Sequence, residues 1–71
     1  MMNQRPKMTP SETKNIVREL SLLARGMRKT GERMKRLDPL ADSRLHLHGI
    51  ELCGAAMLAA HWAEQIERLE L

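Results

Sequence analysis

Apolar residues, together with two threonines, recur in the first half of the chain at alternating spacings of three and four residues. These positions are Thr13, Ile16, Leu20, Leu23, Met27, Thr30, Met34 and Leu37. Such spacing puts side chains on one face of an α-helix, and an apolar face of this length is typical of a helix that packs against other helices. The pattern therefore predicts a long first helix whose seam faces a neighbour.

Local signals set the ends of this helix. Thr9 can cap it, Pro10 suits the first helical position, and Glu12 can complete a capping box. Pro39 disfavours helical geometry at the residue before it, so the helix should end near residue 37. Residues 1–8 then form a flexible tail, and residues 9–71 form one helical hairpin domain.

The second helix has two possible starts, at Asp38-Pro39 or at Asp42-Ser43, because both pairs offer capping oxygens. We favour a short turn over residues 38–42 and a helix that runs almost to Leu71. Its apolar stripe should face the first helix and consists of Leu45, Gly49, Leu52, Ala56, Ala59, Ala63 and Ile66. The predicted fold is thus all-α, an antiparallel two-helix hairpin.

A single hairpin leaves part of the second helix uncovered, because Leu47, Ile50, Met57 and Leu58 lie off the stripe. The chain has no Tyr, no Phe and one Trp, so bulky core residues are scarce. We therefore expect a homodimer in which two hairpins form a four-helix bundle. The predicted interface consists of Ile50, Cys53, Ala56, Met57 and Ala60.

The net charge is +3, and basic residues concentrate in the second half of the first helix. The predicted partner-binding residues are Arg25, Arg28, Lys29, Arg33 and Arg36. Three interpretations stay open: a solvated face, a docking site for an acidic protein, or a nucleic-acid contact. Nucleic acid is the less favoured partner, because the chain has no helix-turn-helix spacing and no aromatic platform for bases.

No residues have the types and spacing of a catalytic or metal centre, and no cofactor is indicated. Cys53 lies among apolar and small residues, which predicts a buried, unreactive thiol rather than a nucleophile. His46 and His48 are two residues apart, so they point to different sides of a helix and cannot share one ion there. Trp62 is expected in the hairpin core, with an interface residue as the alternative.

The chain shows no export or membrane signal. Its first eight residues are polar and basic, with no apolar stretch behind them. The longest uncharged stretch, from Leu52 to Ala63, has 12 residues, whereas a membrane span needs about 20. A cytoplasmic, reduced setting without membrane contact is expected.

Two segments carry a resemblance to a known group, residues 48–57 (HGIELCGAAM) and residues 62–66 (WAEQI). They resemble a segment of small helical accessory proteins of temperate bacteriophages. In size, charge and two-helix plan, the chain is similar to the phage quorum-sensing anti-activator family. That resemblance implies a dimeric helical inhibitor that disables a host transcription activator by binding it.

Together these observations predict a noncatalytic helical homodimer that binds and inhibits a host protein. The alternative is a basic, DNA-associated accessory or regulatory protein, because a symmetric dimer with an arginine cluster could contact phosphates nonspecifically.

Overall fold

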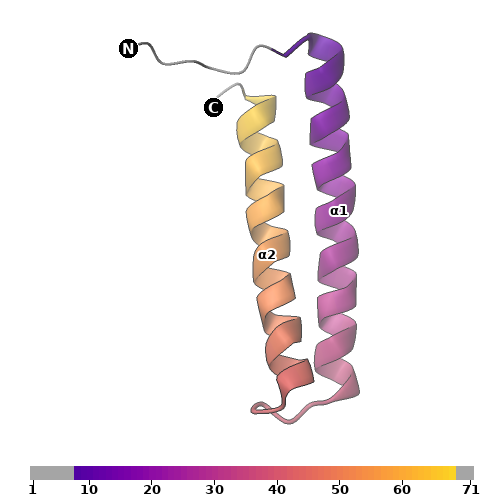
Figure 1. The fold of residues 1–71 in the computed structure, drawn as a ribbon, viewed down its shortest axis with the longest axis vertical. Coiled ribbons are helices and arrows are strands. Elements are labelled where there is room, and N and C mark those ends of the chain that lie inside the picture. Colours follow the sequence, from indigo (N-terminus) through magenta and orange to yellow (C-terminus); the bar gives the residue numbers. More distant parts are fainter. Residues whose placement is uncertain (1–7, 69–71) are drawn as a thin grey trace, which may run out of the picture.

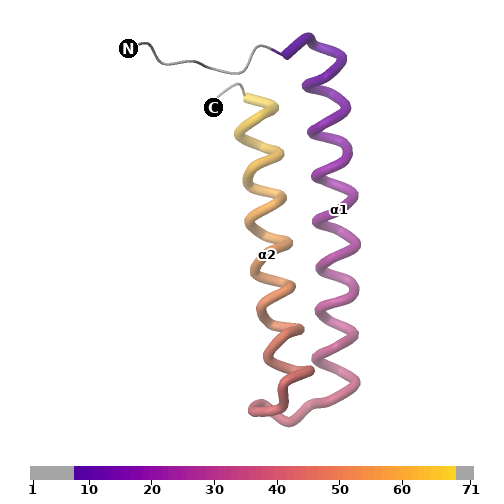
Figure 2. Tube along the Cα trace, in the orientation of Figure 1, coloured from indigo at the N-terminus to yellow at the C-terminus, as the bar shows by residue number. Residues whose placement is uncertain are grey.

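A computed structural model describes residues 8–68, which form two α-helices and no strand. Helix α1 spans Pro10–Leu37 and helix α2 spans Arg44–Glu67. The helices lie side by side and antiparallel (Figure 1). The start of α1 and the end of α2 lie at one end, and their connection lies at the other (Figure 2). The predicted all-helical, two-helix plan is confirmed; residues 1–7 and 69–71, which include most of the predicted tail, fall outside the described part.

Helix α1 begins with the predicted capping box. The backbone N–H of Glu12 donates to Thr9 Oγ1 at 3.1 Å, and the backbone N–H of Thr9 donates to Glu12 Oε1 at 2.9 Å. These bonds satisfy donors that have no partner within the helix. At the other end, helical geometry stops at Leu37, before the Asp38-Pro39 pair. Both ends of α1 therefore agree with the local sequence signals.

Helix α2 begins at the later of the two candidate starts. Ser43 caps it, since Ser43 Oγ accepts the backbone N–H of His46 at 3.0 Å. Asp38 instead supports the turn, where its Oδ1 accepts the backbone N–H of Leu40 at 3.3 Å. The connection is consequently a short turn between two capped helix ends.

The side chain of His46 ties the start of α2 to the end of α1. Its Nδ1 lies 3.0 Å from the Asp38 carbonyl oxygen and 3.3 Å from the Lys35 carbonyl oxygen. Both oxygens are acceptors, so the contact requires a proton on Nδ1. The Lys35 carbonyl is one of the last-turn acceptors that α1 leaves unpaired. His46 thus fixes the turn, a role that the sequence did not reveal.

Replacing His46 with alanine should therefore destabilise the protein by about 1–2 kcal/mol, because the carbonyl groups lose a hydrogen-bond donor. His48→Ala is the matched control, since His48 is exposed and its Nδ1 bonds only its neighbour Glu51, at 2.8 Å. Urea unfolding followed by circular dichroism measures both variants. An equal loss in the two would contradict the assigned role of His46.

The interface between the helices is built from small side chains. The buried apolar residues are Ala24, Ala56, Ala59, Ala63 and Ile66, and no large side chain among residues 8–68 is fully buried. Alanine removes little apolar area from water, so each contact stabilises the hairpin only modestly. The pair of helices consequently has a thin core.

Two glycines make the helices approach closely. A Cβ on Gly49 would lie 2.7 Å from the Gly31 carbonyl oxygen, and a Cβ on Gly31 would lie 2.8 Å from the Gly49 carbonyl oxygen. Neither backbone leaves room for a side chain at that point. Close approach at this level explains why two residues with poor helix propensity lie inside long helices.

The seam of α1 differs from the prediction at three of its eight positions. Leu23, Thr30 and Leu37 are exposed, whereas the others are partly buried as predicted: Thr13, Ile16, Leu20, Met27 and Met34. Ala24 and Gly31 are buried in place of Leu23 and Thr30. Small residues occupy these positions because they allow the two helix backbones to come together. The larger apolar side chains then lie at the edge of the helix interface.

Candidate protein-binding surfaces

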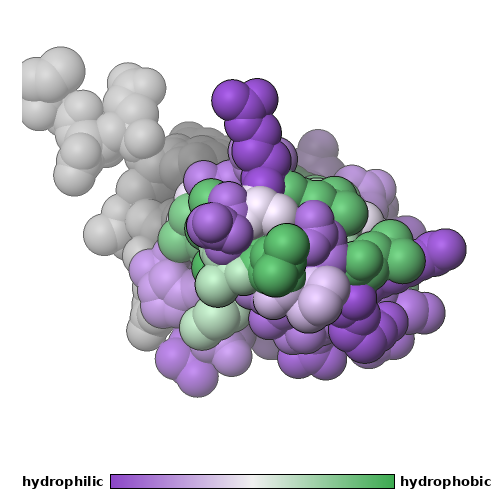
Figure 3. Space-filling view, turned by 90° about the horizontal axis from the view of Figure 1, so that it is seen from below, coloured by the Kyte–Doolittle hydropathy of each residue, from purple (hydrophilic) through white to green (hydrophobic). Residues whose placement is uncertain are grey.

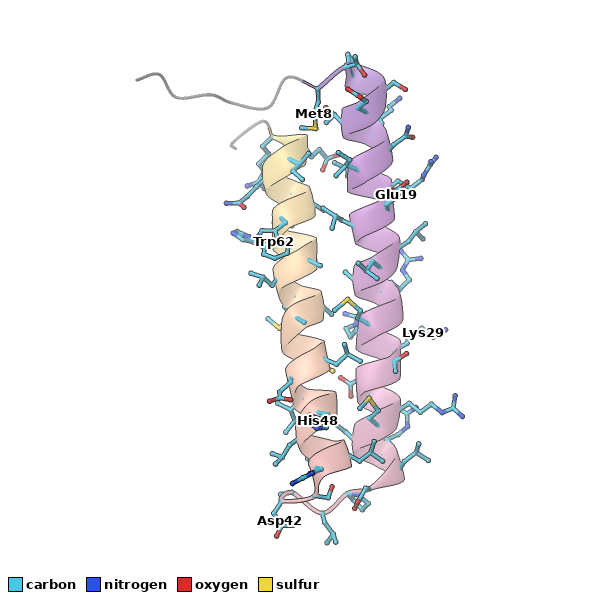
Figure 4. The ribbon with its side chains drawn as sticks, in the orientation of Figure 1. Met8, Glu19, Lys29, Asp42, His48 and Trp62 are labelled. Carbon is cyan, nitrogen blue, oxygen red and sulfur yellow. The ribbon has the colours of Figure 1, made fainter. Side chains whose placement is uncertain are left out.

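The first candidate surface is the basic face of α1, defined as Arg25, Arg28, Lys29, Arg33 and Arg36. All five side chains are exposed, and except for the adjacent Arg28 and Lys29 they follow one another at spacings of three or four residues, which gathers them on one side of the helix. Lys29 points away from α2 (Figure 4). The predicted partner-binding residues are thus free of the hairpin contact.

The cations of this face lack acidic partners within the described chain. Among residues 8–68, the ion pairs are Lys35 Nζ with Glu32 Oε1 at 3.3 Å and His48 with Glu51. Neither pair includes a member of the basic face. The negative end of the α1 dipole stabilises the residues of the last turn, Arg36 above all, but not Arg25 or Arg28.

A groove runs between the helices beside the basic face. It encloses about 340 Å³, its floor includes Ala24, Ala56 and Ala63, and Arg25 and Arg28 belong to its α1 side. Glu64 and Glu67 line its α2 side. The groove therefore joins an apolar floor to walls of opposite charge.

The acidic end of α2 lies at the same end of the hairpin as the basic start of α1. Within residues 8–68, neither Glu64 nor Glu67 pairs with Lys14 or Arg18 at 4.0 Å or less. Arg18 instead donates to Asn15 Oδ1 at 3.2 Å. Exposed pairs of this kind contribute little, so their absence costs the fold little.

The second candidate surface is the outer face of α2, the side turned away from α1. Its apolar members are Leu47, Ile50, Gly54, Met57, Leu58 and Trp62. Met57 is 71% exposed, and Leu58 and Trp62 are about half exposed. Seen from the turn end, exposed hydrophobic atoms also lie between the polar ones (Figure 3), where Leu37, Leu40 and Leu45 are exposed.

Trp62 is not in the hairpin core. Its side chain is 47% exposed and lies on α2 (Figure 4), so the core prediction is wrong for this hairpin. Alanines occupy the interior at this level, and they leave no space for an indole between the helices. The alternative, an interface residue, stays a prediction.

The five residues predicted for the dimer interface are divided between two sides of α2. Ile50, Met57 and Ala60 are exposed, whereas Ala56 is only 3% exposed and Cys53 is partly buried. Cys53 Sγ would meet a Cβ on Gly31 at 2.7 Å, so its side chain packs on α1. Ala56 and Cys53 thus pack inside the hairpin, and the outer face of α2 also exposes Gly54, Leu58 and Trp62, which the predicted interface does not include.

The surroundings of Cys53 do not favour a nucleophile. Its Sγ lies 3.9 Å from the Arg28 carbonyl oxygen and 3.8 Å from Glu32 Oε2. A reactive thiolate needs a cation, a metal or a helix N-terminus beside it, whereas these neighbours are oxygen acceptors. The thiol is partly buried and fills space next to Gly31.

The described helices offer no metal group and no membrane span. Among residues 8–68, no three His, Cys, Asp or Glu side chains are placed to hold one ion. Neither described helix combines the length and apolar content that crossing a bilayer requires. The arrangement that remains consists of two exposed surfaces, one basic and one apolar.

Comparisons with known proteins add no relative to this picture. No family model, no curated protein and no solved structure matches the chain significantly.

Proposed function

We propose that this chain is a noncatalytic helical homodimer that binds a host protein and inhibits it, with a transcription activator as the host protein. The basic face of α1 is the proposed contact. The observation that carries this proposal is the set of five exposed Lys and Arg side chains on one side of a helix, without acidic partners in residues 8–68. The resemblance of residues 48–57 and 62–66 to phage anti-activators supports a bacterial regulator as the partner.

A protein partner fits this face better than a nucleic acid does. The groove beside Arg25 and Arg28 has an apolar floor and an acidic far wall formed by Glu64 and Glu67. An acidic wall repels phosphates, whereas a folded protein can present both charges and apolar atoms. Duplex DNA remains the second candidate, because a dimer would present the five cations twice.

The test is capture from a bacterial host lysate followed by reconstitution with the purified partner. The variant Arg28→Glu/Lys29→Glu/Arg33→Glu reverses the centre of the basic face. Lys14→Glu/Arg18→Glu is the control, with reversed cations on the same helix outside that face. We expect the first variant to bind the partner about 100-fold more weakly, since charge pairs at interfaces couple strongly, and the control to bind normally.

Inhibition is measured with the partner's own promoter in a transcription assay, where the native chain should lower transcript yield and the reversed variant should not. Retention of every partner by the reversed variant would refute the assigned contact. Tight binding of duplex DNA at low salt, lost steeply as salt rises, would favour the DNA-associated alternative instead.

A further inference from the structure

Gly54, like Gly26 on α1, is a glycine that the hairpin does not explain. Gly31 and Gly49 allow close approach of the helices, but a Cβ on Gly54 would meet nothing within 4 Å. A glycine inside a helix lowers stability by about 1 kcal/mol relative to alanine, so an open site should favour a side chain. Gly54 lies on the outer face of α2, where the absence of a side chain would let another surface come close to the backbone.

The middle of the outer face of α2 also lacks charge. No Asp, Glu, Lys or Arg occurs from Leu52 to Ala63, while Met57, Leu58 and Trp62 expose about half or more of their surface there. Large apolar side chains gathered on one exposed face are typical of a contact surface. An uncharged, apolar surface would bind here most favourably. The same face of a second copy is such a surface.

The face is complementary to itself when two copies run antiparallel. Its central line consists of Leu47, Glu51, Gly54, Leu58, His61 and Gln65, at alternating spacings of four and three residues. Pairing centred midway between Gly54 and Leu58 puts Gly54 opposite the partner's Leu58, a large side chain facing a gap. The same register puts Glu51, the only acidic residue of the line, opposite the partner's His61.

The flanks of the line agree with this register. Met57, the most exposed of the large apolar side chains on the described helices, would lie beside the partner's Met57 next to the twofold axis. Methionine repacks easily against its own kind because its side chain is unbranched. Most of the basic face of α1 lies away from this line, but Arg25 and Arg28 line the same groove as Met57 and so lie near the proposed interface.

We propose that the outer face of α2 binds the outer face of a second copy in antiparallel orientation, with Gly54 against the partner's Leu58. This inference rests on the homodimer of the proposed function and assigns its interface. It replaces Cys53 and Ala56, which pack on α1, with Gly54 and Leu58.

The first test compares Leu58→Arg with Leu22→Arg by sedimentation. Leu22 is the matched control, because it is an exposed leucine within α1, 58% exposed against 48% for Leu58. An arginine at position 58 places two charges in the apolar interface, so the dissociation constant of the dimer should rise about 100-fold or more. Leu22→Arg should dimerise like the native chain.

The second test needs no disruptive change. In a Cys53→Ser background, Met57→Cys should join two copies through a short bis-maleimide, since the two sulfurs lie near the twofold axis. Leu47→Cys should not, because antiparallel pairing separates the two copies of residue 47 by about 27 Å, at 1.5 Å per residue. Leu22→Cys on α1 is the unlinked control.

The outcomes distinguish the two claims, that the chain forms a homodimer and that the outer face of α2 is its interface. Loss of the dimer in Leu58→Arg alone, or linkage through residue 57 alone if that variant fails to fold, supports the interface. Linkage through residue 47 overturns the antiparallel register. A native dimer that survives Leu58→Arg overturns the interface but leaves the proposed homodimer standing, whereas a monomeric native chain overturns both.

Discussion

The variant Ala56→Arg is expected to be unfolded at room temperature. Ala56 is 3% exposed and lies between the helices, so an arginine there would either force them apart or bury an unpaired charge. Either result costs about 3–5 kcal/mol, which equals the whole stability that a chain of this size commonly has. Far-ultraviolet circular dichroism should show loss of most helical signal.

Ala60→Arg is the control for this prediction, because Ala60 is an exposed alanine one helical turn further along α2. Its new side chain can reach water, so the variant should stay helical and should still dimerise. Dissociation of Ala60→Arg would contradict the outer-face interface and support the interface predicted from the sequence, which included Ala60.

The second large effect is expected from a single methyl group at Gly49. A Cβ there would lie 2.7 Å from the Gly31 carbonyl oxygen and 3.1 Å from the Lys35 backbone nitrogen. Backbone atoms cannot move aside as a flexible side chain can, so the helices must separate locally. We expect Gly49→Ala to lower the free energy of unfolding by about 2 kcal/mol, despite the better helix propensity of alanine.

Gly26→Ala shows what the same change does without the contact. A Cβ on Gly26 meets nothing within 4 Å, so this variant should gain up to about 1 kcal/mol from helix propensity alone. Urea unfolding at a fixed protein concentration measures both variants. Equal shifts of the two midpoints would show that the helices do not touch at Gly49.

The ends of the helices were predictable because their signals are local. Thr9 and Glu12 bond each other across one turn, and Pro39 restricts the residue before it. Ser43 could be named as one of two caps, but the choice between them depends on where the chain turns. The bounds of α1 therefore followed from neighbouring residues alone, whereas the start of α2 did not.

The direction in which α1 faces was harder to predict, because an apolar stripe does not show which of its edges is buried. Leu23 scores as a better core residue than Ala24 on hydrophobicity, yet Ala24 is buried and Leu23 is exposed. Backbone approach at Gly31 and Gly49 decides this orientation, and it depends on both helices at once. His46 was missed for a similar reason, since its acceptors lie eight and eleven residues away.

Of the two candidate surfaces, one could be predicted from the sequence and the other could not. The exposure of the basic face followed from its spacing on α1, whereas the outer face of α2 could be separated from the inner one only with the contacts of Ala56 and Cys53 known. Trp62 shows most clearly that burial could not be predicted from the sequence alone. Its size predicts burial, but the hairpin leaves it half exposed.

Dependence on a second copy is best tested by unfolding the native chain in urea at several concentrations, followed through Trp62, the only aromatic residue among Tyr, Phe and Trp. A dimer that unfolds to single chains predicts a midpoint that rises with protein concentration, and Trp62 emission at shorter wavelength in the concentrated samples. A cooperative transition of an 8.2 kDa single chain, with the same midpoint from nanomolar to micromolar concentration, would contradict it.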